Sequence, residues 1–254
     1  MARGLHDVSG QVGTRSDTFN DGRSWLTFFD QGDRVLRDPD LQRARYERIA
    51  QDLERLIPLH PGLQMLDYGC GDALAASRYL ARGVRLALYD RSPRIMEQLR
   101  HRFAGAADVR ALSSKEYEEI PPDQFDVILV HSVIQYISSP QLPGLLRRWH
   151  TLLKPGGTLV VSDILTRSTS GWADAFSLLR FGLSQGMTRS VLQDLMHVLN
   201  SRYHALHRTV GLTRYDVIEL KESLARAGFD VQRLPVNPGP LRGRCAYRAI
   251  KPPE

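Results

Sequence analysis

The amino-acid sequence predicts an α/β fold in which a mostly parallel sheet carries helices on both faces. Short apolar runs alternate with amphipathic stretches along most of the 254 residues, which is the pattern of strands joined by crossover helices. A turn with two glycines separates the first apolar run from the helix expected after it. A chain of this length can bury a full core, so we expect a single domain.

Five strands are expected before this alternation is interrupted. They coincide with the apolar runs at residues 64–67, 85–89, 109–112, 127–130 and 158–162. Two helices in this part of the chain have clear starts, one before the first strand at Pro39 and one after the second strand at Ser92-Pro93, because each has a proline in its first turn. The first of these helices should end before Pro58.

The alternation breaks after the fifth strand and resumes near the end of the chain. A helical stretch is expected at about 172–206, inside an insertion that covers about 165–212. A helix at 215–227 then stops at Gly228, and two last strands start near residues 229 and 244. Residues 1–18 are polar and rich in glycine and serine, so we expect a flexible N-terminus and one domain over 19–254.

The most informative segment is Met-Leu-Asp-Tyr-Gly-Cys-Gly-Asp-Ala at residues 65–73. A buried strand ends in Asp67, and Gly69 and Gly71 then allow the backbone to turn sharply and to approach a ligand closely. A helix is expected from Ala73 onward. Asp90 closes the next apolar run 23 positions after Asp67, where an acid can accept both hydroxyls of a ribose. The segment therefore predicts a nucleoside site.

The same segment argues against a dinucleotide. A dinucleotide-binding turn has a third glycine where this chain has Leu74. Asp67 and Asp72 would also repel a pyrophosphate. A ligand with a ribose and a cationic amino-acid tail suits these carboxylates better.

Four motifs in order resemble the class I S-adenosylmethionine-dependent methyltransferases. They are Leu-Asp-Tyr-Gly-Cys-Gly-Asp at 66–72, Asp90, Phe-Asp-Val-Ile-Leu-Val-His at 125–131, and Leu-Lys-Pro-Gly-Gly-Thr-Leu-Val-Val at 153–161. An ordered set is far more specific than a lone glycine turn. The resemblance covers most of the chain and implies a doubly wound, mostly parallel, seven-stranded Rossmann-like sheet, with the insertion after strand five covering the substrate.

The resemblance also implies S-adenosyl-L-methionine as the cofactor and a set of residues that contact it. These cofactor-binding candidates are Asp67, Gly69, Cys70, Gly71, Asp72, Asp90, Arg91, Ser113, Ser114 and His131. Many members of the family place an acid after the third strand to bind the adenine amino group. This chain has serines there, and a hydroxyl can do only part of that work.

The implied reaction is methyl transfer to a small organic acceptor, with an oxygen or nitrogen nucleophile, by in-line displacement. Such a transfer depends mainly on alignment and exclusion of water. His131 is the first catalytic candidate, because it follows strand four at the carboxyl edge of the sheet, where ligands bind in open α/β folds. We favour a role in the pocket wall or in donor contact over a general base. His204 and His207, at the end of the insertion, are acceptor-site candidates.

Three further features have plainer interpretations. Asp163 lies just past strand five, and we expect it to cap a turn or helix rather than to contact the acceptor. Gln135 and Tyr136 could reach the cleft from a turn that is mainly a packing element. The aromatic stretch at 25–29 is more often a packed helix face than a ligand lid.

Several partner classes are disfavoured. The net charge of +6 includes no block of five like charges, so we expect a solvated surface rather than nucleic acid. No apolar run is long enough for a membrane span, and the N-terminus lacks a secretion signal, so we expect a cytoplasmic protein.

Cys70 and Cys245 give no reason for pairing. We predict no metal, because no acid cluster accompanies the histidines. Nothing in the sequence determines the oligomeric state.

Two alternatives of other classes stay open. An aminopropyl transferase on the same scaffold would need an acidic diamine pocket, whereas the insertion has arginines and few acids. A catalytically silent module that binds the donor or assembles with a partner would show no turnover with any acceptor.

Overall fold

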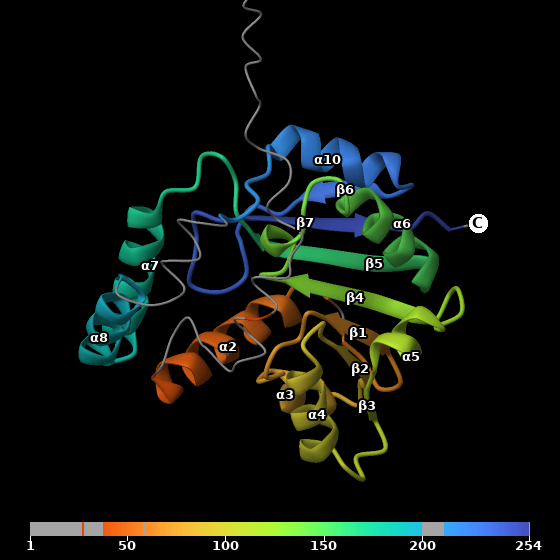
Figure 1. The fold of residues 1–254 in the computed structure, drawn as a ribbon, viewed down its shortest axis with the longest axis horizontal. Helices are drawn as coiled ribbons and strands as arrows, with labels where there is room; N and C mark the ends of the chain where they lie inside the picture. Colours follow the sequence, from red (N-terminus) through yellow and green to blue (C-terminus); the bar gives the residue numbers. More distant parts are fainter. Residues whose placement is uncertain (1–26, 28–37, 58, 200–210, 254) are drawn as a thin grey trace, which may run out of the picture.

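The computed structural model of the protein describes residues 27, 38–57, 59–199 and 211–253. Its centre is a seven-stranded sheet in the order β3-β2-β1-β4-β5-β7-β6 (Figure 1). The strands are β1 Gln64–Tyr68, β2 Arg85–Tyr89, β3 Val109–Ala111, β4 Phe125–His131, β5 Leu153–Ile164, β6 Asp230–Arg233 and β7 Cys245–Ile250. The first five strands pair in parallel, and β7 is antiparallel to both of its neighbours. The predicted α/β fold class, with its mostly parallel sheet, is confirmed.

Helices cover both faces of the sheet. One face carries α2 Pro39–Glu54, α3 Ala76–Leu80 and α4 Pro93–Arg102, and the other carries α5 Ser114–Glu118, α6 Leu142–Leu152 and α10 Val217–Arg226. The short 3-10 helix η1 Ile134–Tyr136 follows β4. Ser92 caps α4 by accepting a hydrogen bond from Ile95 N at 3.2 Å, as its position before Pro93 predicted.

The alternation of side chains along each strand divides the core in two. In β4, Ile128 and Val130 join the cluster under α6 and α10, whereas Val127 and Leu129 join the cluster under α2 to α4. His131 continues the second series, so it lies on the α2 side of the sheet. Asp67 follows Met65 of that same cluster and is on the same side.

The insertion after β5 contains two packed helices, α7 Gly171–Ser184 and α8 Thr188–Leu199. Its two ends meet beside the sheet, where Tyr215 N donates to Leu165 O at 3.0 Å and Arg167 N donates to Tyr215 O at 3.2 Å. The helical expectation for this stretch is confirmed over 171–184 and 188–199, and residues 185–187 form the turn between the two helices. The rest of it, from 200 to 206, lies outside the described residues.

Two local expectations need correction. The helix after the glycine turn begins at Ala76 instead of Ala73, because Ala73 has φ +46°, which is incompatible with a right-handed helix. Strand five is longer than expected and begins at Leu153, before the Pro-Gly-Gly turn. The N-terminal residues 1–18 and all but one residue of the aromatic stretch at 25–29 lie outside the described residues.

None of the described helices is long and apolar enough to cross a bilayer.

Candidate functional site

The glycine turn after β1 is held against the end of β2 by backbone hydrogen bonds. Gly69 N donates to Tyr89 O at 2.7 Å, and Cys70 N donates to the same oxygen at 3.2 Å. Arg102 from α4 donates to Asp72 O at 2.7 Å and supports the far side of the turn. The chain thus reverses directly above the carboxyl ends of two neighbouring strands, where ligands bind in open α/β sheets.

The two glycines of the turn serve different purposes. Both have positive φ, +74° at Gly69 and +51° at Gly71. A Cβ at Gly69 would overlap the side chain of Val133, so this glycine allows the turn to pack on the segment after β4. A Cβ at Gly71 would meet no atom within 4 Å, so it would project into open space above the turn. That open space is where a ligand can approach the backbone.

Asp90 is tied to this turn through both carboxylate oxygens. Oδ2 accepts from Gly71 N at 3.1 Å, and Oδ1 accepts from Ser92 N at 2.9 Å. Burial raises the pKa of Asp90, although these backbone hydrogen bonds oppose the shift. The carboxylate therefore has a fixed orientation and keeps lone pairs free to accept hydroxyl groups.

Asp67 lies on the preceding strand, close enough to Asp90 for the two charges to interact. Burial and then the Asp90 charge raise the pKa of Asp67 to about 7. Burial raises the pKa of both acids, so a ligand that brings a cation and hydroxyl donors stabilises their ionised forms. An adenosyl sulfonium compound with an amino-acid tail has both, so the residues present fit the predicted cofactor.

The other predicted cofactor residues have varied settings. Cys70 is buried, and burial raises the pKa of its thiol, so it contributes backbone and packing rather than a thiolate. Arg91 is exposed directly after Asp90. Ser113 caps α5 in a capping box with Glu116, so its hydroxyl is already engaged. Ser114 is exposed at the start of the same helix.

His131 ends β4 on the same side of the sheet as Asp67. Its Nδ1 is 2.9 Å from Ser162 Oγ of the neighbouring strand, whereas Nε2 is buried and has no hydrogen-bond partner in the part of the chain that the structure describes. Burial lowers the pKa of His131 to about 4, and the opposing effect of Asp163 is smaller. The imidazole is therefore neutral near pH 7, with one nitrogen available to a ligand.

The interpretation of Asp163 as a turn or helix cap is wrong. β5 continues to Ile164, and the Asp163 side chain is buried, with Oδ2 3.7 Å from Arg45 Nη2. Burial raises its pKa, but the charges of Arg244, His131 and Arg45 outweigh this effect and hold the pKa of Asp163 below its usual value. The residue also has φ +58°, and Ser132 at the end of β4 has φ +59°. Such strain in non-glycine residues is typical of functional sites.

A cluster of buried polar atoms surrounds the ends of β4 and β5. Among the described residues, four atoms here have no hydrogen-bond partner: His131 Nε2, Asp163 Oδ1, Gln135 Oε1 and Arg45 Nε. Buried polar atoms in native proteins are nearly always paired, so a group of four indicates a place for a polar ligand. We call these residues the polar cluster. Arg45 lies on α2. Its spacing of four residues from Ile49 predicts which side of the helix it is on, but the sequence does not identify Asp163 as its partner.

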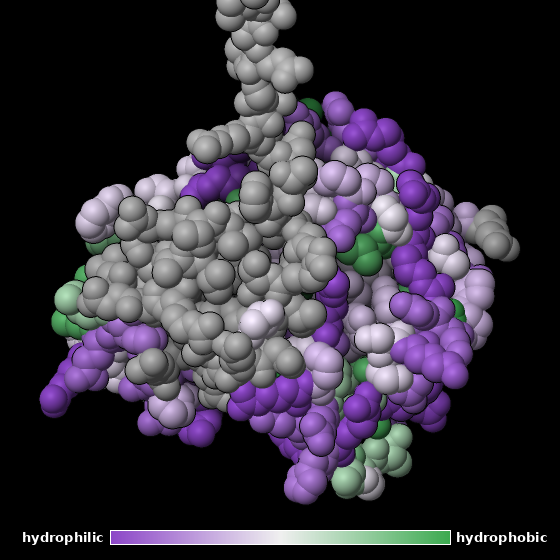
Figure 2. All heavy atoms as spheres, in the orientation of Figure 1, coloured by the Kyte–Doolittle hydropathy of each residue, from purple (hydrophilic) through white to green (hydrophobic). Residues whose placement is uncertain are grey.

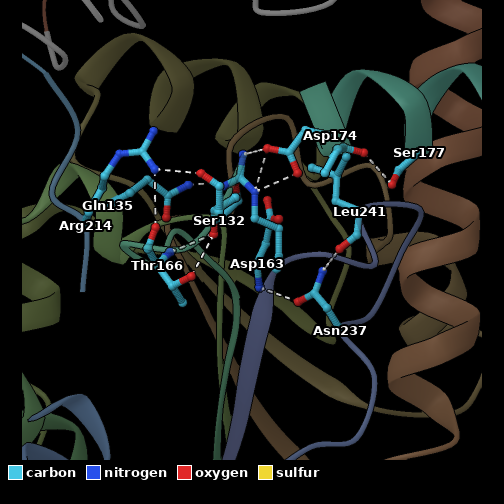
Figure 3. A network of polar contacts seen from close by, with 12 residues as sticks. Ser132, Gln135, Asp163, Thr166, Asp174, Ser177, Arg214, Asn237 and Leu241 are labelled. Atoms are coloured by element: carbon cyan, nitrogen blue, oxygen red, sulfur yellow. Dashed lines mark hydrogen bonds and ion pairs between the residues drawn. The ribbon is translucent and has the colours of Figure 1, made fainter. Parts of the chain in front are cut away.

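Further hydrogen bonds fix the backbone around the polar cluster (Figure 3). Asp163 N donates to Asn237 Oδ1 at 2.7 Å, and Asn237 Nδ2 donates to Leu241 O at 3.1 Å. Gln135 Nε2 donates to Ser132 Oγ at 3.0 Å. The loop before β7 thus holds Asp163 in its unusual conformation. Sequence reasoning missed Asn237 because it is 74 residues away from Asp163.

His204 and His207 lie outside the described residues, so their place relative to the polar cluster stays a prediction. Within the part of the chain that the structure describes, no group of three or more His, Cys, Asp or Glu side chains could hold a metal ion. Cys70 and Cys245 are both buried and free.

The strand order and the glycine turn with its two acids define the class I S-adenosylmethionine-dependent methyltransferases. A family model described as "Methyltransferase domain" matches residues 41–234, which is more than half of the chain. The chain belongs to this family, and S-adenosylmethionine is its cofactor.

Curated relatives resemble part of the chain. A malonyl-(acyl-carrier protein) O-methyltransferase of Serratia marcescens is 30% identical over 126 residues, 48% of each chain. A ubiquinone biosynthesis O-methyltransferase of Pseudomonas aeruginosa is 29% identical over 106 residues, 41% of this chain and 45% of the relative. The chain therefore spans less than half the length of these relatives.

A solved structure resembles nearly the whole fold. The 1,6-didemethyltoxoflavin-N1-methyltransferase of Burkholderia thailandensis has a TM-score of 0.56 and 19% identity, with 91% of this chain and 87% of that chain covered. At this identity the likeness concerns the fold alone.

A pair of glycine variants tests the turn. We expect Gly71→Ala to weaken donor binding by about tenfold or more, because its methyl group enters open space at the ligand side of the turn, and to cost about 1 kcal/mol of stability, because an alanine is strained at φ +51°. Gly69→Ala should lower the free energy of unfolding more, by about 2–4 kcal/mol, because its methyl group also overlaps Val133 in addition to the strain at φ +74°. Calorimetric titration with the donor and urea unfolding measure the two effects. Equal effects of both variants on donor affinity would contradict this assignment.

An Asp67→Asn variant tests the pair of acids. Because the pKa of Asp67 is about 7 in the folded protein and about 3.8 when unfolded, the ligand-free wild type should lose stability as the pH rises from about 4 to 7. Asp67→Asn should remove this loss and be more stable at pH 8 by about 1–4 kcal/mol, while it binds the donor more weakly. Asp108→Asn, at an exposed acid, is the control. A wild-type stability that rises through this range would refute the assignment.

Proposed function

We propose that the protein transfers a methyl group from S-adenosylmethionine to a small organic acceptor, by in-line displacement at an oxygen or nitrogen nucleophile. The observation that carries the proposal is the polar cluster, which lies on the carboxyl edge of β4 and β5, beside the glycine turn that follows β1. Asp67 and His131 lie on the same face of adjacent strands. A donor and a polar acceptor bound there would be neighbours.

The donor side is assigned to the glycine turn and its acids. In this proposal Asp90 accepts the ribose hydroxyls, Asp67 faces the cationic amino-acid portion, and Gly71 leaves space for close backbone contact. The donor supplies a methyl group that its sulfonium already activates, so the protein's contribution is alignment and exclusion of water. The raised pKa of Asp67 supports this assignment, because a bound ammonium group would restore its ionised form.

The acceptor side is assigned to the polar cluster, with His131 as a positioning contact. A pKa of about 4 makes the neutral imidazole a weak base, and its free Nε2 is suited to a hydrogen bond with the acceptor. This supports the wall or contact role over that of general base. Arg45 and Asp163 offer a cation and an anion beside it. The insertion at 165–212, with His204 and His207, is proposed to cover the acceptor.

The comparisons support an oxygen or nitrogen acceptor in general terms. The two curated relatives are named as O-methyltransferases, and the Burkholderia protein is named as an N1-methyltransferase. Their substrates are properties of those proteins. For this chain the acceptor class stays a proposal that rests on the polar cluster.

A screen with a labelled methyl donor tests turnover. The protein is incubated with S-adenosylmethionine labelled in the methyl group and with fractions of a cell extract, and we expect label in a small organic product. The control is the Asp90→Ala variant, which should lose the transfer. Label that stays in the donor across all fractions, with donor binding intact, would favour the silent donor-binding module instead.

A His131 series tests the acceptor contact. We expect His131→Ala to lower kcat/KM for the acceptor by about tenfold to a hundredfold, with donor affinity changed by less than about threefold, because one buried hydrogen bond is lost. His131→Gln should recover part of the activity, since an amide also forms hydrogen bonds. Because the folded pKa is about 4, wild-type turnover should show no inflection from His131 between pH 5 and 8. An inflection near pH 6.5 that His131→Gln removes would instead make it a general base.

A further inference from the structure

The helical insertion presents large apolar side chains to solvent. On α7, Trp172 is 88% exposed and Phe176 is 67% exposed, and Leu183 is exposed on the same helix. On α8, Leu192 and Met196 are exposed as well. We call these five residues the hairpin face. Figure 2 shows hydrophobic atoms at the left edge of the molecule, where Figure 1 places α7 and α8.

The exposed residues recur at helical spacing. Trp172, Phe176 and Leu183 are separated by four and then seven positions, which places them on one side of α7. Leu192 and Met196 are four apart on α8. The helices therefore have an outward apolar stripe in addition to the side that packs on the protein. An apolar stripe of this kind on a surface helix marks a binding surface.

Buried polar contacts anchor the hairpin from its other side. On α7, Asp174 forms an ion pair with Arg244 at 2.6 Å, and both side chains are largely buried. On α8, the buried Asp194 accepts a hydrogen bond from Asp38 N at 3.2 Å. Gly182 allows the two helices to approach closely at Val191. The hairpin is therefore held against the core with its apolar stripe outward.

The exposed charged side chains on the two helices of the hairpin have one sign. The exposed charged side chains of α7 and α8, within their described bounds, are Arg180 and Arg189, since both acids of these helices are engaged in the anchoring contacts. An exposed apolar stripe whose only exposed charges on the described parts of α7 and α8 are arginines complements an interface that is apolar inside and negatively charged at its surface. Tryptophan is also the residue most typical of a membrane–water interface.

We propose that the hairpin face docks on the surface of an anionic phospholipid bilayer. The helices lie in the interface without crossing the bilayer, with Trp172 and Phe176 among the acyl chains and the two arginines at the lipid phosphates. A second copy of the chain is a poorer occupant, because face-to-face packing would place the arginines of one copy against those of the other with no exposed acid on α7 or α8 to pair with them. This inference concerns location and does not depend on which acceptor is methylated.

Vesicle flotation with the full chain tests this docking. We expect the protein to float with vesicles of equimolar phosphatidylcholine and phosphatidylglycerol, to bind vesicles of phosphatidylcholine alone much less, and to be released from the mixed vesicles by high salt. The double variant Trp172→Ser/Phe176→Ser should reduce the bound fraction by about tenfold or more. Ile218→Ser is the matched control, because Ile218 is 68% exposed but lies on α10.

A second pair of variants separates local charge from net charge. Arg180→Glu/Arg189→Glu should weaken vesicle binding by about tenfold or more, whereas Arg100→Glu/Arg147→Glu, at exposed arginines of α4 and α6, changes the net charge equally and should have a much smaller effect. Thermal melting and donor titration on the same preparations show that each variant is folded.

Three results would overturn the docking proposal. The first is wild-type protein that fails to float with anionic vesicles. The second is a loss of binding in the control variants as large as the loss in the hairpin variants. The third is a concentration-dependent dimer in sedimentation equilibrium that Trp172→Ser/Phe176→Ser dissociates. The last result would assign the hairpin face to a second copy. Intact donor binding in the same samples would leave the proposed methyl transfer unaffected.

Discussion

The structure depends on two acids that the fold places close together at the end of the first two strands. Asp90 is oriented by two backbone hydrogen bonds, and burial, followed by the charge of Asp90, raises the pKa of Asp67 to about 7. An arrangement of this kind lowers the stability of the ligand-free protein and is useful when a ligand relieves it. A nucleoside with a cationic tail does so, which links the electrostatics of the turn to the family's cofactor.

Parallel pairing explains how the residues proposed to bind the acceptor come to lie beside this turn. Because β1, β4 and β5 are adjacent and parallel, their carboxyl ends meet at one edge of the sheet, and the alternation of side chains places Asp67, His131 and Ser162 on the α2 side. Arg45 of α2 then faces the same space. The proposed donor and acceptor sites are therefore consequences of one topology.

Much of this could be predicted from local patterns. The glycine turn, Asp90 and the capped start of α4 depend on neighbouring residues, so their spacing sufficed. The environment of Asp163 could not be predicted, because Arg45, Asn237 and Arg244 reach it from distant parts of the chain. Ala73 shows a second limit: its helix propensity is overridden by the geometry of the turn, which requires a positive φ at that position.

Calorimetric titration of the ligand-free protein with S-adenosylhomocysteine, at pH 7 in two buffers of different ionisation enthalpy, tests the central claim most directly. The account predicts binding that releases a fraction of a proton, because the ligand's ammonium group drives Asp67 to its ionised form. Absence of binding heat in both buffers would contradict the assignment of the turn. Binding with no proton release would contradict the role given to Asp67.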